Sequence, residues 1–247
     1  MFSIFKKKKA TPVDLSSLGT DMHSHLLPGI DDGAADTEMS LQLITGLHDL
    51  GYKQFITTPH IYWDLYKNNA ATIGSAHAKL QQALLEKDNR VSIKPAAEYF
   101  LDDHFDELLD TNTPLLTIHD NWVLVEFSFV TVPLNFKNKL FNMQMKGYQP
   151  ILAHPERYLY FMNDRSWYDE LKNAGCYFQL NILSLAGYYG KASQQLAHYL
   201  ISKQYVNLLG TDCHHERHIE ALRAAGSSVM EPMQSMLDTG SLLNPSL

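Results

Sequence analysis

Seven short apolar runs in this sequence each end in a polar residue that can bind a cation or an anionic substrate. The first run leads into two histidines one residue apart, and the last leads into an aspartate and a histidine with the same spacing. The positions that follow the seven runs are His23 with His25, His60, Glu98, Glu126, His154, Asn181, and Asp212 with His214. Reactive groups at the ends of successive strands indicate one metal site assembled at the mouths of many strands.

Helix-like segments separate the apolar runs, and several end at a glycine just before the next run, as at Gly51, Gly147 and Gly175. Glycine suits the left-handed position that ends a helix. Units of roughly 30 to 40 residues, each with one strand and one helix, predict a parallel α/β fold. About seven units favour a barrel related to the TIM type, with its site at the carboxyl ends of the strands. An open doubly wound sheet is the alternative, and it predicts ligands from one switch point only.

The bulk composition bounds the class of protein. A chain of 247 residues with 45% hydrophobic residues can bury a full core, and no linker is evident. We therefore expect a flexible basic tail at residues 1–17 and a single domain at residues 18–247. The net charge of -7 argues against nucleic acid as a partner, and two cysteines are too few for a disulfide framework.

The first nine residues carry four lysines beside Phe2, Ile4 and Phe5, but no apolar stretch long enough for a signal peptide or a membrane span. We therefore expect a cytoplasmic protein with a solvated tail. The alternative is weak contact of these lysines with an anionic membrane surface or an acidic partner, each lysine adding about 1 kcal/mol.

The mixture of histidine and carboxylate ligands points to a transition metal such as zinc, manganese or iron. Some of these positions also have a structural explanation. His60 could be a satisfied core histidine, and Asp32 could cap the helix that starts near Ala35 instead of reaching a second ion. Glu98 and Glu126 follow strongly apolar runs, where an ionised carboxylate needs a metal or a basic partner.

Two arginines are candidates for contact with an anion. Arg157 and Arg217 each lie three residues beyond a candidate histidine ligand, and a guanidinium suits bidentate phosphate recognition. An ordinary surface ion pair is the alternative for each. Glu156 could hold Arg157 or touch a metal, and Cys213 is expected to be a packed bystander.

Together these motifs resemble the PHP (polymerase and histidinol phosphatase) superfamily, and within it the bacterial metal-dependent protein-tyrosine phosphatases of capsule and exopolysaccharide gene clusters. The resemblance covers about residues 18 to 240. Its motifs are Asp21–Gly33, Thr58–His60, Ala97–Tyr99, Glu126, Ala153–Tyr158 and Gly210–His214. It implies a distorted (β/α)7 barrel with three divalent metal ions, manganese first, with iron or zinc as alternatives.

The resemblance also implies which residues hold the ions. The three ligand groups are His23, His25, Glu98 and Asp212; Glu98, as a bridge, with Glu126 and His154; and Asp32, His60 and His214. Arg157 matches a phosphate-contacting arginine. The family often has Asn after the last histidine and Arg several residues on, whereas His215-Glu216-Arg217-His218 stands here. The role of Arg217 is therefore open.

The implied activity is hydrolysis of phosphotyrosine on a bacterial tyrosine kinase that governs polysaccharide synthesis or export. Closely spaced divalent ions lower the pKa of a bound water and bind the phosphoryl oxygens, so no protein nucleophile is needed. Neither Cys176 nor Cys213 begins the Cys-x5-Arg loop of cysteine phosphatases. His60 or His214 could protonate the leaving phenolate. A small-molecule phosphoesterase, such as a histidinol phosphatase, and a non-catalytic docking module are the alternatives.

Overall fold

The computed structural model describes residues 12–133 and 135–247 as an alternation of strands and helices. The strands are β1 (Thr20–Asp21), β2 (Gln54–Thr57), β3 (His60–Ile61), β4 (Ser92–Pro95), β5 (Glu98–Phe100), β6 (Trp122–Glu126), β7 (Gln149–Ala153), β8 (Tyr177–Asn181) and β9 (Leu208–Gly210). The α-helices are α1 (Thr37–Asp49), α2 (Ala70–Glu86), α3 (Asp103–Asp110), α4 (Phe136–Met145), α5 (Ser166–Asn173), α6 (Ile182–Leu185), α7 (Lys191–Ser202), α8 (Glu216–Ala225) and α9 (Ser227–Asp238). The short 3-10 helices are η1 (Ser16–Leu18), η2 (Pro155–Arg157), η3 (Leu159–Met162) and η4 (Asn244–Ser246).

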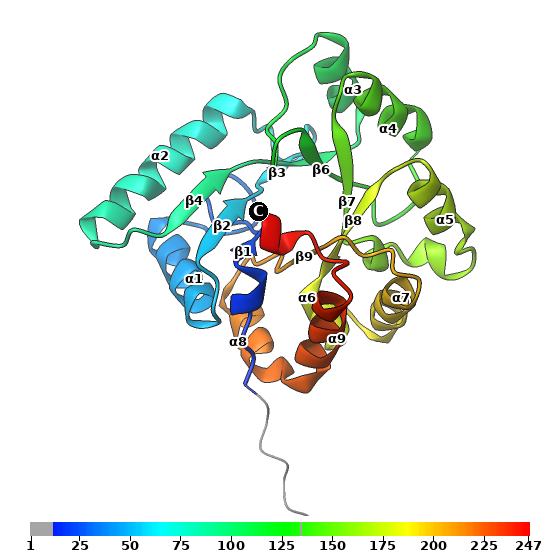
Figure 1. Cartoon of the computed structure of the whole chain (residues 1–247). Coiled ribbons are helices and arrows are strands. Elements are labelled where there is room, and N and C mark those ends of the chain that lie inside the picture. The colour runs from blue at the N-terminus through cyan, green and yellow to red at the C-terminus, as the bar shows by residue number, and fades with distance from the viewer. Residues whose placement is uncertain (1–11, 134) are drawn as a thin grey trace, which may run out of the picture.

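The described strands form two parallel sheets, with the orders β1-β2-β4 and β3-β5-β6-β7-β8-β9. In register, Asp21 pairs with Phe55 in the first sheet, and Asn181 pairs with Gly210 at the β9 edge of the second. An isolated parallel bridge between Ser24 and Cys213 links the chain beyond β1 to the chain beyond β9. Figure 1 shows the strands gathered in the centre and the longer helices around them. The predicted α/β class with parallel strands is therefore confirmed.

Two of the seven predicted runs are each divided into two strands. Thr58 and Pro59 separate β2 from β3, and two alanines separate β4 from β5. Proline has no N–H to donate, which interrupts regular pairing. The neighbouring chains remain in contact across the break, because the N–H of Ala96 donates to the carbonyl of Thr57 (2.8 Å) and the N–H of Glu98 to that of Pro59 (3.1 Å).

The helix ends follow the sequence signals. Gly51, Gly147 and Gly175 come directly after the last turns of α1, α4 and α5, with φ of 109°, 87° and 79°. At Gly51 a Cβ atom would also come within 2.6 Å of the backbone nitrogen of Ser16, so only glycine fits there. Asp36 caps α1 by accepting the N–H of Met39 at 2.9 Å, which excludes the structural explanation of Asp32 as this cap.

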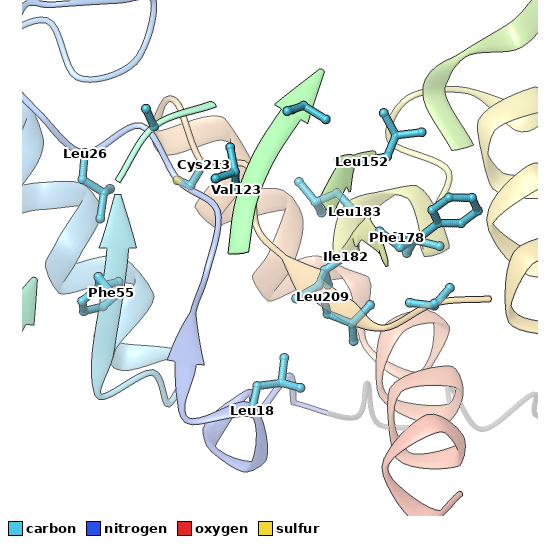
Figure 2. Close-up of a cluster of buried hydrophobic side chains, with 14 of the residues drawn as sticks. Leu18, Leu26, Phe55, Val123, Leu152, Phe178, Ile182, Leu183, Leu209 and Cys213 are labelled. Carbon is cyan, nitrogen blue, oxygen red and sulfur yellow. The ribbon is translucent and has the colours of Figure 1, made fainter. Parts of the chain in front are cut away.

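Two clusters of buried side chains make up the core. The larger joins the strands to the helices, and Figure 2 shows part of it, with Phe55, Val123 and Phe178 among the labelled side chains. The smaller comes mainly from the strands and the residues next to them, namely Met22, Ile56, Ala96, Ile118, Leu124, Ile151, Ala153 and Leu208. Parallel strands buried on both faces explain why these runs are almost continuously apolar.

The chain before η1 is part of this core. Val13 and Leu15 are buried, and the N–H of Leu15 donates to the carbonyl of Leu50 at 2.7 Å. The predicted end of the tail at residue 17 therefore lies too far along the chain. The lysines at 6–9, with their predicted membrane contact, lie outside the described residues. Among the described helices, none is both long enough and apolar enough to cross a membrane.

Candidate metal centre

All nine predicted metal ligands converge in one cluster at the carboxyl ends of the strands. Their ligand atoms fall into four groups, and within each group the atoms lie within 4.8 Å of one another. The groups are His23, His25 and Glu98; His23, His154 and Asp212; His60, Glu98 and Glu126; and His25, Asp32, His60 and His214. The strand ends thus bring together residues that lie up to 191 positions apart in the chain.

Four possible ligand atoms lie close to one another in the deepest part of the cluster. His23 Nε2 lies 3.2 Å from Glu98 Oε2, 3.4 Å from Asp212 Oδ1 and 3.4 Å from His25 Nε2. His25 Nε2 lies 3.4 Å and 3.5 Å from the same two carboxylate oxygens. Two atoms that bind the same transition-metal ion with bonds of about 2.1 Å lie roughly 3 to 3.5 Å apart. The spacing therefore fits a divalent transition-metal ion.

The two deepest histidines are held in the orientation that metal binding requires. His25 Nδ1 donates to Asp31 Oδ2 at 2.8 Å, and His23 Nδ1 donates to Gln179 Oε1 at 2.8 Å. Each bond places the hydrogen on Nδ1 and leaves the lone pair of Nε2 facing the cluster. Asp31 and Gln179 were not predicted. Asp31 directly precedes the predicted ligand Asp32 in the acidic turn, and this position was the only sequence signal for its role.

Glu98 lies between this group and a second one. His154 Nε2 is 3.1 Å from Glu98 Oε1 and 3.9 Å from Glu126 Oε2. His60 Nδ1 is 3.3 Å from Glu98 Oε2 and 3.0 Å from Glu126 Oε1, yet within the described residues this buried nitrogen makes no hydrogen bond. A buried nitrogen without a hydrogen bond is costly unless a cation binds it, so His60 is not a satisfied core histidine.

The third group lies at the mouth of the cluster. Asp32 Oδ1 is 3.5 Å from both His60 Nε2 and His214 Nε2. His214 Nδ1 donates to the carbonyl of Asp212 at 2.8 Å, which again turns Nε2 toward the cluster. The Asp32 side chain is 52% exposed, whereas Glu98 is fully buried. The cluster therefore extends from a buried end to an end open to solvent.

The carboxylates of the cluster are held in their ionised form. Burial favours the neutral form of Glu98, but the nearby His23 and His60 hold its pKa well below the usual range. Asp212 is buried as well, and His23 and His214 keep its pKa well below the usual value. Burial opposes the charged form of His25, yet Asp31 raises its pKa well above the usual value. The carboxylates thus carry negative charge that divalent cations would neutralise.

Backbone conformation at the strand ends is unusual. His154 and Asp212 have φ of 34° and 51°, a left-handed region that non-glycine residues rarely adopt. Close packing also occurs at Gly210, the last residue of β9. A Cβ atom built there would lie 2.7 Å from His23 Cβ and 2.8 Å from Gln179 Nε2. Gly210 therefore makes room for the histidine and for the glutamine that orients it.

We expect Gly210→Ala to weaken metal binding and to lower the free energy of unfolding by about 1–3 kcal/mol, because the new methyl group must displace His23 or Gln179. Metal content after dialysis and denaturant unfolding measure the two effects. Gly74→Ala is the matched control, since a Cβ at this exposed position of α2 meets nothing within 4 Å. Equal metal content and stability in the Gly210 variant and the wild type would contradict this prediction.

A cavity of about 260 Å³ opens onto the cluster, and Arg157 lines it. Arg157 Nη1 donates to Asp212 Oδ2 at 2.9 Å. Its guanidinium lies over the rings of Phe129 and Tyr189, 4.6 Å and 4.3 Å from their centroids. The structure therefore brings Arg157 to the site. Phe129 and Tyr189 were not predicted, because both lie outside strands and helices and belong to no motif.

The structure does not bring Arg217 to this cavity. Arg217 is exposed in the first turn of α8, whereas His215 and His218 of the same segment line the cavity. The helix turns the arginine outward and the two histidines inward. A larger groove of about 670 Å³ lies between α1 and α8, and it holds none of the nine predicted ligands.

Glu156 neither holds Arg157 nor lies in the metal cluster. It is buried and accepts hydrogen bonds from Ser184 Oγ (2.6 Å) and from the backbone N–H of Asn181 (3.0 Å). Burial raises the pKa of this carboxyl. Its role is to fasten the end of β8 to η2. Both interpretations made from the sequence are therefore wrong.

The parallel α/β fold and the histidine–carboxylate cluster together define a metal-dependent hydrolase. The chain matches the family described as "Capsular polysaccharide synthesis, CpsB/CapC" over residues 19–231. It belongs to this family.

The relatives bear out the predicted family and enzyme class. The chain is 30% identical to tyrosine-protein phosphatase YwqE of Bacillus subtilis over 195 residues, 78% of this chain and 76% of the relative. It is 27% identical to tyrosine-protein phosphatase CpsB of Streptococcus pneumoniae over 201 residues, 78% and 82% of the two chains. A crystal structure from a study of YwqE and CpsB, described as metal-dependent tyrosine phosphatases, superposes with a TM-score of 0.79 at 26% identity, covering 92% of this chain and 90% of the other. Membership of a family of metal-dependent tyrosine phosphatases is therefore confirmed.

Proposed function

We propose that this chain removes phosphate from phosphotyrosine on a bacterial tyrosine kinase of polysaccharide synthesis or export, with divalent ions bound by the nine clustered residues. The observation that carries the proposal is the close approach of the ring nitrogens of His23 and His25 to carboxylate oxygens of Glu98 and Asp212, inside a fold whose curated relatives are named tyrosine phosphatases. Membership of a capsular polysaccharide synthesis family supports a kinase of that process as the substrate.

We propose three bound ions, each held by its own group of these residues. The first would lie between His23, His25, Glu98 and Asp212, and Glu98 would share it with a second ion at Glu126 and His154. Asp32, His60 and His214 would hold the third, with His25 beside them. Mixed nitrogen and oxygen ligands suit manganese, iron or zinc. We propose manganese as the working ion on the resemblance alone.

When bound, the divalent ions supply a water of lowered pKa and neutralise the phosphoryl oxygens. The chain itself contributes the rest. Arg157 lines the cavity with its guanidinium over the rings of Phe129 and Tyr189, and its N–H groups that do not bind Asp212 would bind phosphoryl oxygens. His60 or His214 would give a proton to the phenolate oxygen only where metal does not fully engage that histidine. A phenol pKa near 10 makes the phenolate a fairly good leaving group, so this help is modest.

The fold would be a distorted (β/α)7 barrel formed by both sheets. Three observations support this. The divided runs carry the chain from β2 to β3 and from β4 to β5, the bridge from Ser24 to Cys213 joins the outer edges, and a separate apolar cluster comes from the strands. We also propose that residues 12–247 form one domain. The cytoplasmic location stays a prediction.

A comparison of substrates tests the function. The manganese-loaded enzyme should release phosphate from a phosphorylated tyrosine kinase and from phosphotyrosyl peptides cut from its tail, with kcat/KM at least about 100-fold above that for histidinol phosphate. A difference of that size corresponds to about 2.7 kcal/mol of transition-state binding. The reverse preference would indicate a small-molecule phosphoesterase, and no turnover by the metal-loaded enzyme would indicate a docking role.

A further inference from the structure

His218 occupies the position next to the cluster where an arginine was expected. It lies in the first turn of α8, is only 6% exposed, and lines the same cavity as Arg157 and the metal-binding residues. Arg217, its neighbour in the chain, faces solvent. The segment after His214 thus offers the cavity an imidazole instead of a guanidinium.

A hydrogen bond fixes the tautomer of His218. The backbone N–H of His214 donates to His218 Nδ1 at 3.1 Å. A nitrogen that accepts a hydrogen bond carries no hydrogen, so the hydrogen of the neutral ring is on Nε2. Within residues 12–133 and 135–247, His218 Nε2 has no hydrogen-bond partner. It is also absent from the fully buried unpaired atoms of these residues, so it is accessible from outside. Its N–H is therefore available to a molecule in the cavity.

Aromatic neighbours hold the ring in place. The ring of His215 lies 4.0 Å from that of His218, and the ring of Tyr188 meets it edge-on at 5.1 Å. Tyr189 lies beside both Arg157 and His218. The centre of its ring is 6.3 Å from that of His218 and 4.3 Å from the guanidinium carbon of Arg157. Arg157, Tyr189 and His218 thus line the same cavity, with Tyr189 next to both of the other residues.

We propose that His218 is a second phosphate-contacting residue, which donates its Nε2 hydrogen to a non-bridging oxygen of the phosphoryl group while Arg157 binds another. This inference rests on the proposed phosphatase function and names a residue of the same site. The ligand class is a phosphate monoester dianion or inorganic phosphate. A preorganised donor of this kind stabilises charge on the transferring group without reorganisation.

The competing explanation is that His218 serves only to accept the N–H of His214 and so to shape the loop. Two substitutions separate the explanations. Asn carries an oxygen at the position of Nδ1 and can accept that N–H, but it has no donor at the position of Nε2. Gln carries an amide nitrogen close to the position of Nε2, but it has no acceptor at Nδ1.

The test is the binding of inorganic phosphate to manganese-loaded protein, by calorimetry and by competitive inhibition, with metal content measured on each sample. We expect His218→Asn to raise the Kd for phosphate about tenfold at unchanged metal content, as for the loss of one hydrogen bond to a charged group. His218→Gln should stay within about threefold of the wild type. His198→Asn, at an exposed position of α7, is the control and should match the wild type.

The opposite order, with Asn like the wild type and Gln impaired, would overturn the proposal and show a structural role. Equal phosphate binding in all variants would overturn it as well. Failure of the proposed function is distinguishable, because in that case the wild type itself would hydrolyse no phosphotyrosyl peptide.

Discussion

Glu98→Gln is expected to lower kcat/KM for a phosphotyrosyl peptide by about 10³-fold, with loss of bound metal. The substitution keeps the size of the side chain and removes its charge. Glu98 Oε2 lies within 3.4 Å of ring nitrogens of His23, His25 and His60, and Oε1 lies 3.1 Å from His154 Nε2, so one change affects two ligand groups. Losing the metal ions that Glu98 is proposed to hold costs about 4 kcal/mol of transition-state stabilisation, which is about 10³ in rate.

Metal content and turnover should be measured on the same samples of this variant. Glu86→Gln makes the same chemical change at an exposed position of α2 and serves as the control. Full metal content with normal turnover in Glu98→Gln would show that this carboxylate is not a ligand. Folding of the variant is checked by its circular dichroism spectrum, so that loss of metal is not confused with unfolding.

Arg157→Ala is expected to lower kcat/KM by about 10²- to 10³-fold, the usual loss for one preorganised donor to a developing anion. Arg157→Lys should recover little of this. Lysine keeps the charge but lacks the planar group that lies over the rings of Phe129 and Tyr189, and it cannot form two parallel hydrogen bonds. Steady-state kinetics with a phosphotyrosyl peptide measure the effect.

Arg157 also binds Asp212, so its loss could lower turnover by removing a phosphate contact or by releasing metal. Metal content distinguishes these two explanations. Asp212 keeps a second donor, Asn181 Nδ2 at 2.7 Å, so the metal should remain bound in the Arg157 variants. Arg217→Ala should change kcat/KM by less than about twofold, as is usual for an exposed side chain away from the site. A large loss for Arg217 and a small one for Arg157 would reverse the roles assigned by the structure.

Much of the fold could be predicted from local signals. Buried parallel strands have near-continuous apolar runs, and glycines such as Gly51 and Gly175 occupy left-handed positions that few other residues tolerate. The breaks at Pro59 and after β4 could not be placed, since they depend on pairing between distant strands. The burial of Val13 and Leu15 was also missed, because two apolar residues near a lysine run carry no periodic pattern.

Some residues of the site could be predicted from the sequence, and others could not. Eight of the nine predicted ligands follow strand ends, and parallel strands gather their ends at one face, so their approach could be predicted from the sequence. Asp32 stands further on, in the acidic turn after the first run. The residues that orient the ligands carry no such signal. In the sequence Gln179 is only a polar residue inside a strand, and its hydrogen bond to His23 is seen only in the structure. The choice between Arg217 and His218 depends on the rotation of α8, which the order of residues alone does not fix.

The most direct test of the central claim is phosphate release from a phosphotyrosyl peptide by chelated enzyme reconstituted with manganese, for the wild type and His154→Ala side by side. His154 Nε2 faces Glu98 and Glu126 but contacts no predicted anion-binding residue through that nitrogen. The expected result is metal-dependent release by the wild type, which the variant loses together with bound metal. No release by a wild type shown to carry its metal, or equal release by the variant, would contradict it.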